Sequence, residues 1–234
     1  MRHPRFGTDG GLPASLPMGT ADVAYHLAMG GRPLPAGFLF GFPGRAPTLD
    51  SVRARVAERA HRIPALRYRI DRANRTFSRV ERIAVEQHVH EAWLPGDDDG
   101  SGAGRLMLSR PMGGDVRPPW DVWLVHGPNG GHSLCYRTDH TVQDGVGAAH
   151  TARALLDDDP AGGPPAHRRA WPALSGLAGA VGDVTASFRP VRKPGFDVPP
   201  GGRTDMCQAV VPVARLRAVG RAHGATVNDV FLAA

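Results

Sequence analysis

The alternation of apolar and polar residues predicts helices and strands along the first two thirds of the chain. Residues 49–61 place Leu49, Val52, Val56 and Ala60 on one face at helical spacing. A second helix is expected at 20–29, where Thr20 can cap its first turn. Strands are predicted for GFLFGF at 37–42 and for 66–70, where apolar residues alternate with arginine.

The clearest pattern is a hairpin that leads into a polar motif. WDVWLVHG (120–127) and HSLCYRT (132–138) are separated by PNGG, and an Asn-Gly pair tolerates the positive φ of a tight turn. The second strand is followed by DHTVQDG and then by a predicted helix at 146–156. The motif is therefore expected between a strand and a helix.

The remaining segments suggest a division of the chain. The run GDDDGSGAG (96–104) has no apolar side chain larger than alanine and predicts a flexible loop. We expect a flexible N-terminus at 1–17, an α/β domain at 18–156, a Pro/Gly-rich crossover linker at 157–205 and the start of a second domain at 206–234. That last part should hold a strand at 206–213, a helix at 213–223 and a helix from Asn228, which ends too soon to bury its apolar face and so indicates truncation.

Composition excludes several classes of protein. The chain has 234 residues, of which 41% are hydrophobic, and no apolar run approaches the ~20 residues of a membrane span. No secretory signal is evident, so a cytoplasmic location is expected. The net charge is +6, but the arginines are scattered and do not form the stripe of a nucleic-acid site. Cys135 and Cys207 match no zinc spacing and should be buried thiols.

His140 and Asp144 are the residues best suited to chemistry. A neutral imidazole can take the proton of a hydroxyl that attacks a carbonyl, so His140 suits acyl transfer as a general base. Asp144 can hold the loop through backbone N–H groups, and Gly145 permits a sharp turn or the close approach of a ligand. The spacing alone favours the simpler interpretation, in which His140 is a polar strand-end residue and Asp144-Gly145 an ordinary turn.

Other polar and aromatic residues receive simpler interpretations. His88 and His90 alternate on a predicted strand and are expected at the surface. His132, His140 and Asp144 could be drawn as a metal site, but no close His pair supports it, so no metal is expected. The tryptophans should be core or interface residues, with Trp120 packing under the DHTVQDG loop: Trp93, Trp120, Trp123, Trp171.

Several separated segments resemble one family. DHTVQDG is similar to the HHxxxDG motif of the wax ester synthase and bacterial diacylglycerol acyltransferase family, within the superfamily of condensation domains and chloramphenicol acetyltransferase. The other similar segments agree in order and cover nearly all of 18–234: IPALRYRI, EQHVHEAWLP, LSRPMGGDVRPPWDVWLVHG and GATVNDVFLAA.

The resemblance implies a fold, a reaction and a set of site residues. The fold would be α/β, a mixed and mostly antiparallel sheet flanked by helices, forming one half of a chloramphenicol-acetyltransferase-like two-domain protein. The reaction would move a fatty acyl group from acyl-CoA, a substrate, to a long-chain alcohol or diacylglycerol, with no cofactor and with contact to a membrane or lipid-droplet surface allowed. His140 would be the base, Asp144 and Gly145 the motif residues, and Asn228 and Asp229 supports of the pocket or an ordinary helix cap.

Two departures from the family pattern keep other functions open. Asp139 stands where the family has its first histidine, and a carboxylate there could orient or stabilise the His140 imidazolium. The family also continues into a second domain. The alternatives are a noncatalytic protein that binds lipid or CoA, and a condensation-type enzyme that uses acyl groups bound to a carrier protein.

Overall fold

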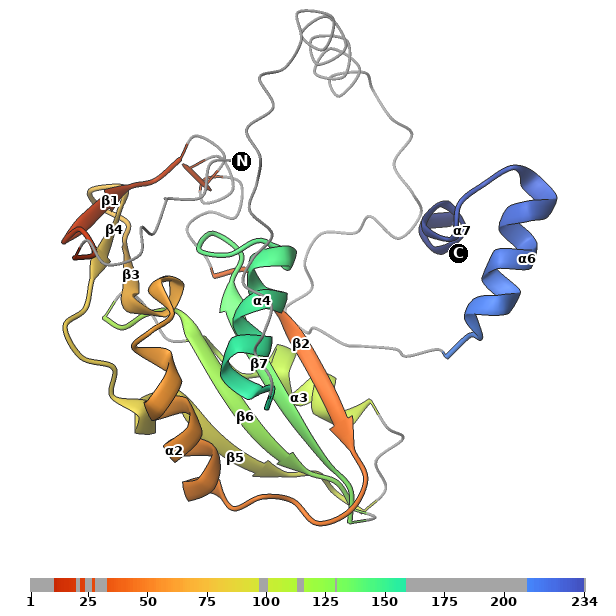
Figure 1. The fold of residues 1–234 in the computed structure, drawn as a ribbon, viewed down its shortest axis with the longest axis horizontal. Helices are drawn as coiled ribbons and strands as arrows, with labels where there is room; N and C mark the ends of the chain where they lie inside the picture. Colours follow the sequence, from red (N-terminus) through yellow and green to blue (C-terminus); the bar gives the residue numbers. More distant parts are fainter. Residues whose placement is uncertain are drawn as a thin grey trace, which may run out of the picture.

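The computed structural model describes residues 11–19, 22–23, 27, 33–96, 101–112, 116–128, 130–158 and 210–233. Within these residues the fold is built on two sheets (Figure 1). The larger has the order β2-β7-β6-β5, and the smaller the order β1-β4-β3. Their strands are β1 (Ser15–Pro17), β2 (Pro35–Phe42), β3 (Tyr68–Asp71), β4 (Thr76–Arg79), β5 (Val89–Trp93), β6 (Trp120–His126) and β7 (His132–Asp139).

The larger sheet is antiparallel except at one edge. β6 and β7 form the predicted hairpin, in which Trp120 pairs with Thr138, and Gly130 in its turn has a φ of 76°. β2 pairs antiparallel with the outer side of β7, whereas β5 runs parallel to β6. The expectation of a mixed, mostly antiparallel sheet flanked by helices is confirmed.

Two helices cover one face of this sheet, α2 (Leu49–Ala60) and α4 (Gly145–Leu156) (Figure 1). Thr48 caps α2 by accepting a hydrogen bond from the Ser51 N–H, and the predicted stripe of Val52, Val56 and Ala60 is buried. These side chains pack with alternate residues of β6 and β7, Val122, Leu124 and Tyr136 among them. The predicted helices at 49–61 and 146–156 are both confirmed.

The opposite face is covered by α3 (Gly102–Ser109), a helix that the sequence pattern did not predict. Its Ala103 and Met107 pack on Val125 and Cys135. The loop expected at 96–104 is therefore wrong from Gly102 onward, because the first turn of this helix packs on the sheet through Ala103, without a large apolar side chain. Residues 97–100 lie outside the described residues.

Several other predicted elements have bounds that differ from those expected. Ser15–Pro17 pair with β4 as β1, so the flexible N-terminus does not extend to residue 17. Leu66 belongs to a short 3-10 helix, Pro64–Arg67, and the strand starts at Tyr68. A second 3-10 helix, Val85–Gln87, precedes β5. Of the helix expected at 20–29, Asp22, Val23 and Leu27 are helical and the remainder is outside the described residues.

The last described segment contains α6 (Val213–His223) and α7 (Val227–Ala233). Both helices were predicted, and α6 ends at Gly224, which has a left-handed φ of 63°. The strand expected at 206–213 is wrong for its described part, because Val210–Pro212 have no strand structure and Pro212 begins a helix. The expected linker from residue 159, with Trp171, and the segment around Cys207 lie outside the described residues.

Candidate active site

The DHTVQDG loop joins the end of β7 to the start of α4, as predicted, and its backbone is fixed on both sides. The Asp139 N–H donates to the Pro119 carbonyl at 2.9 Å, on the β6 side. The His140 N–H donates to the Leu34 carbonyl at 2.8 Å, beside the start of β2. The loop is therefore held by the segments that lead into both neighbours of β7.

Asp139 and His140 follow one another but lie in different surroundings. Asp139 is fully buried, and its Oδ1 accepts a hydrogen bond from the Thr141 N–H at 2.9 Å. Its Oδ2 lies 3.9 Å from Nη2 of Arg72, in the turn between β3 and β4. His140 is only partly buried. The Asp139 carboxylate thus organises the loop backbone and links the loop to the smaller sheet, whereas Nδ1 of His140 is buried and the residue as a whole is partly exposed.

Asp144 caps helix α4. Its backbone is extended, with φ −74° and ψ 174°, and its Oδ1 accepts a hydrogen bond from the Gly147 N–H at 2.7 Å. A carboxylate in this position satisfies a free N–H and lies at the positive end of the helix dipole. This geometry agrees with the predicted role of Asp144 in organising the loop.

Gly145 is the first residue of α4 and is exposed. Its φ is not in the left-handed region, and a Cβ added there would meet no atom within 4 Å. The backbone therefore does not require glycine for a sharp turn. The open space beside it is compatible with the other predicted role, the close approach of a ligand.

A buried chain of polar side chains lies under the loop, and the sequence analysis missed it. The Tyr136 hydroxyl donates to Oε1 of Gln143 at 2.8 Å, and Nε2 of Gln143 donates to Oγ1 of Thr151 at 3.0 Å. All three residues are buried, and burial raises the pKa of Tyr136 far above its ordinary value. The only sequence signal is that a glutamine occupies a variable motif position. This chain ties the loop to both β7 and α4.

Trp120 and His88 form a buried stack next to the loop. The two rings lie 4.0 Å apart at 14°, and Nδ1 of His88 donates to the Trp120 carbonyl at 2.8 Å. The Trp120 Nε1–H donates to the Leu66 carbonyl at 3.0 Å. Trp120 pairs with Thr138, one residue before Asp139, which is close to its predicted place under the loop.

The expectation of a surface position for His88 is wrong. Its side chain is 1% exposed, because the residue lies just before β5 and turns toward the core. Burial lowers the pKa of His88 to about 4, so the ring is neutral at neutral pH. His90 packs on Trp123 at 4.6 Å, and burial lowers its pKa as well. Trp93 is not a core residue, since it is 67% exposed and stacks on His126.

A buried ion pair lies two residues before the loop. The Arg137 guanidinium donates to both carboxylate oxygens of Asp121, Nε to Oδ1 at 2.8 Å and Nη2 to Oδ2 at 2.5 Å. Nη1 donates to the carbonyls of Met107 and Arg110 at the end of α3. The pair therefore joins β6, β7 and α3, and it neutralises the charge of Arg137.

Asn228 and Asp229 do not lie beside the DHTVQDG loop. They belong to α7, and in the described part of the chain α6 and α7 stand apart from α4 (Figure 1). Oδ2 of Asp229 accepts from the Thr226 N–H at 2.8 Å, and the Asp229 N–H donates to Oγ1 of Thr226 at 3.2 Å. This reciprocal arrangement is a capping box, and the bonds from Thr226 lower the pKa of Asp229. The helix-cap alternative describes the observed geometry.

The described residues contain no group of three or more His, Cys, Asp or Glu side chains placed to hold a metal ion. None of the helices in the described part of the chain is both long enough and apolar enough to cross a membrane.

Comparison with known proteins identifies the family. The family described as the wax ester synthase/diacylglycerol acyltransferase catalytic domain matches residues 38–191, which include every strand of the larger sheet except the first three residues of β2 and the whole DHTVQDG loop. The chain belongs to this acyltransferase family.

Individual family members agree with this assignment. Two Mycobacterium tuberculosis proteins are each named "Putative diacyglycerol O-acyltransferase". One is 31% identical to this chain over 215 residues, and the other is 27% identical over 225 residues. The alignments cover 82% and 75% of this chain and 47% of each relative, so the chain spans about half the length of the curated relatives it matches.

A solved family structure supports the fold. The wax ester synthase/diacylglycerol acyltransferase from Marinobacter aquaeolei VT8 superposes with a TM-score of 0.57 at 22% identity. The match covers 92% of this chain and 57% of that one. The architecture around the acyltransferase motif is therefore that of the family.

Proposed function

We propose that this chain contributes the catalytic loop of an O-acyltransferase, which moves a fatty acyl group from acyl-CoA to a long-chain alcohol or diacylglycerol. The observation that supports this most strongly is the position of His140. This partly buried residue lies on a loop whose backbone bonds to the Leu34 and Pro119 carbonyls and which ends at Asp144, the cap of helix α4. A base held this way is positioned before the substrate arrives.

The proposed reaction is a direct transfer. His140 takes the proton of the acceptor hydroxyl, and the hydroxyl oxygen attacks the thioester carbonyl carbon. The new C–O bond forms, the C–S bond breaks, and the CoA sulfur leaves with the proton that His140 returns. No cofactor takes part in this scheme. Asp144 and Asp139 are positioning residues in it, since their carboxylates bond to backbone N–H groups. A cytoplasmic location with peripheral contact to lipid is part of the same proposal.

The test is steady-state transfer from hexadecanoyl-CoA to hexadecanol or a diacylglycerol by the 234-residue chain. His140→Ala should lower the rate by roughly 10²–10⁴-fold, the usual contribution of a general base. His61→Ala is the matched control, because His61 is exposed at the end of α2. An unchanged rate in His140→Ala would overturn the mechanism.

One observation favours a second candidate, a noncatalytic protein that binds lipid or CoA. The first motif position is Asp139, which is buried and bonded to the Thr141 N–H, so it cannot act as a second base at the surface. Binding of acyl-CoA without any turnover would support this candidate over the enzyme. Turnover with a carrier-bound acyl group but not with acyl-CoA would instead support the condensation-type reaction.

A further inference from the structure

The carboxylate of Asp139, in the position of the first motif histidine, is fully buried. Its Oδ1 accepts the Thr141 N–H at 2.9 Å, whereas its Oδ2 accepts no hydrogen bond from the described residues. A buried carboxylate destabilises the fold unless an opposite charge or several hydrogen bonds compensate it. A single N–H group leaves most of that penalty in place, so this carboxylate requires a cation.

Arg72 supplies the positive charge. Its Nη2 lies 3.9 Å from Oδ2 of Asp139, and its side chain is 20% exposed. This separation is longer than a direct hydrogen bond but within the range of an ion pair. Because little solvent surrounds either group, their attraction is screened less than that of a pair at the surface.

The turn that carries Arg72, between β3 and β4, is itself held in place. The Asp71 carboxylate accepts two hydrogen bonds from Asn74, from its backbone N–H at 3.1 Å and from Nδ2 at 3.0 Å. The Arg75 carbonyl accepts the Met18 N–H at 3.0 Å, next to the end of β1. Arg72 is therefore presented to the motif loop from a turn with a fixed backbone.

The loop meets the smaller sheet at a second point, beside the ion pair. Val142 packs on the buried apolar cluster of that sheet: Met18, Tyr68, Ile70, Phe77. The Asp139 carbonyl also accepts the N–H groups of Val142 at 2.9 Å and Gln143 at 3.2 Å. His140 thus belongs to a turn that closes on Asp139, and a displacement of Asp139 would displace His140 with it.

We propose that Arg72 is a positioning residue of the acyltransferase site. Its guanidinium compensates the buried charge of Asp139, and through that carboxylate it fixes the backbone that carries His140. The Arg72–Asp139 pair thereby accounts for a carboxylate in the first motif position. This inference rests on the proposed function and adds a residue of the smaller sheet to the site.

Three variants separate the charge from the shape of the pair. Arg72→Met keeps the aliphatic stem and leaves Asp139 uncompensated, whereas Arg72→Lys keeps the positive charge. Asp139→Asn keeps an acceptor for the Thr141 N–H and removes the negative charge. Arg75→Met is the matched control, because Arg75 lies in the same turn and its side chain is exposed.

The first measurement is the kcat and KM of acyl transfer by the 234-residue chain. Arg72→Met should lower kcat roughly 10–100-fold and leave KM within about twofold, because a misplaced base slows the chemical step. Arg72→Lys should stay within about fivefold of the wild type, and Arg75→Met should match it. In the Asp139→Asn background, Arg72→Met should change kcat by less than about twofold, since the charge that it compensates is gone.

The second measurement needs no turnover. Native-state hydrogen exchange of the His140 and Thr141 backbone amides should accelerate at least about tenfold in Arg72→Met, because the loop opens more readily without the pair. The Val122 amide, which bonds to the His88 carbonyl within the larger sheet, reports global unfolding in the same sample. The acceleration is therefore taken relative to Val122.

The outcomes separate this proposal from the proposed function. Unchanged loop exchange in Arg72→Met, or an equal loss of kcat with and without Asp139→Asn, would overturn the role of Arg72 and leave the acyltransferase proposal standing. Faster loop exchange in Arg72→Met, together with an unchanged rate in His140→Ala, would support the pair as the anchor of the loop and overturn the proposed mechanism.

Discussion

At the scale of single residues, the two carboxylates of the motif bond to backbone N–H groups, and the proposed base lies between them in the sequence. Asp139 and Asp144 each accept a backbone N–H, while His140 is left partly exposed. Carboxylates that hold a loop in this way act through its conformation, not through proton transfer. Substitutions that keep the hydrogen bond should therefore preserve activity.

Asp144 tests this distinction. Asp144→Ala should lower the free energy of unfolding by about 1 kcal/mol, because the Gly147 N–H loses its acceptor. Asp144→Asn keeps an acceptor oxygen and should recover most of the stability and of the acyl-transfer rate. The measurements are urea denaturation and turnover of both variants. A stable Asp144→Asn without activity would show that the negative charge itself is needed.

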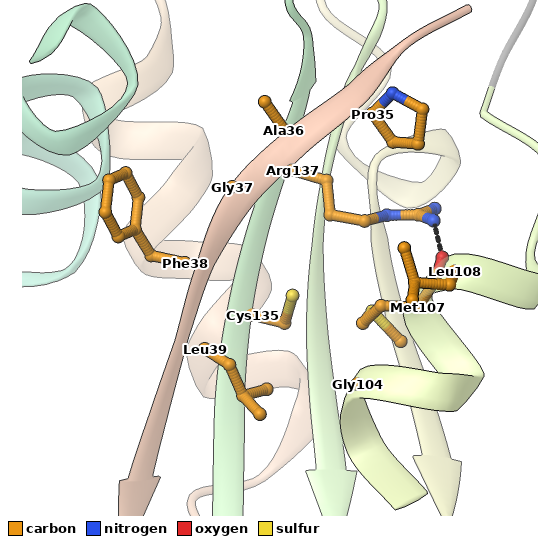
Figure 2. Close-up of a pocket in the computed structure, with 10 residues that line it drawn as sticks. All are labelled: Pro35, Ala36, Gly37, Phe38, Leu39, Gly104, Met107, Leu108, Cys135 and Arg137. Carbon is orange, nitrogen blue, oxygen red and sulfur yellow. Dashed lines mark hydrogen bonds between the residues drawn. The ribbon is translucent and has the colours of Figure 1, made fainter. Parts of the chain in front are cut away.

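At the scale of helices and strands, one ion pair links three elements. Arg137 on β7 bonds to Asp121 on β6 and to two carbonyls at the end of α3. Both charged side chains are almost completely buried. Removing one partner therefore leaves the other as an uncompensated charge in a low-dielectric site, which costs more stability than removing both. The attachment of α3 to the larger sheet depends on this pair (Figure 2).

Arg137→Met should therefore destabilise the chain by about 3–5 kcal/mol, as expected for a buried charge without its partner. The double variant Arg137→Met with Asp121→Leu removes both charges and should recover more than half of that loss. Urea denaturation of the single and double variants gives the comparison. A double variant no more stable than Arg137→Met would mean that the bonds to the α3 carbonyls, not the ion pair, dominate.

At the scale of the whole molecule, two histidines of the described chain differ in how deeply they are buried. His88 is fully buried and stacks on Trp120, whereas His140 is partly buried. A neutral buried histidine makes global stability depend on pH, because the unfolded chain binds the proton more readily.

The sign of this dependence follows from the two pKa values. The folded pKa of His88 is about 4 and its unfolded value 6.5, so its full contribution is present above pH 6.5 and is lost as the pH falls toward 4. The loss should reach about 3 kcal/mol, at 1.36 kcal/mol per unit. Thermal unfolding between pH 7 and 4 should show a steeper decline for wild type than for His88→Phe, which keeps the stack without the titration. Equal slopes would contradict the assignment.

The sequence by itself determined the elements whose signal is local. Periodic apolar residues gave the helices at 49–61 and 146–156, the Asn-Gly turn gave the β6–β7 hairpin, and the motif was placed correctly between strand and helix. These predictions succeed because side-chain spacing and turn chemistry act over a few residues.

Only the tertiary structure decided what depends on partners distant along the chain. α3 was missed because its first turn is glycine and alanine, and its place is set by Cys135 and Arg137. The burial of His88 required Trp120, 32 residues away, and the polar chain through Gln143 required α4 to pack on β7. The pocket between β2, β7 and α3 (Figure 2) depends on tertiary structure for the same reason, because its lining comes from three elements that are separated in the sequence.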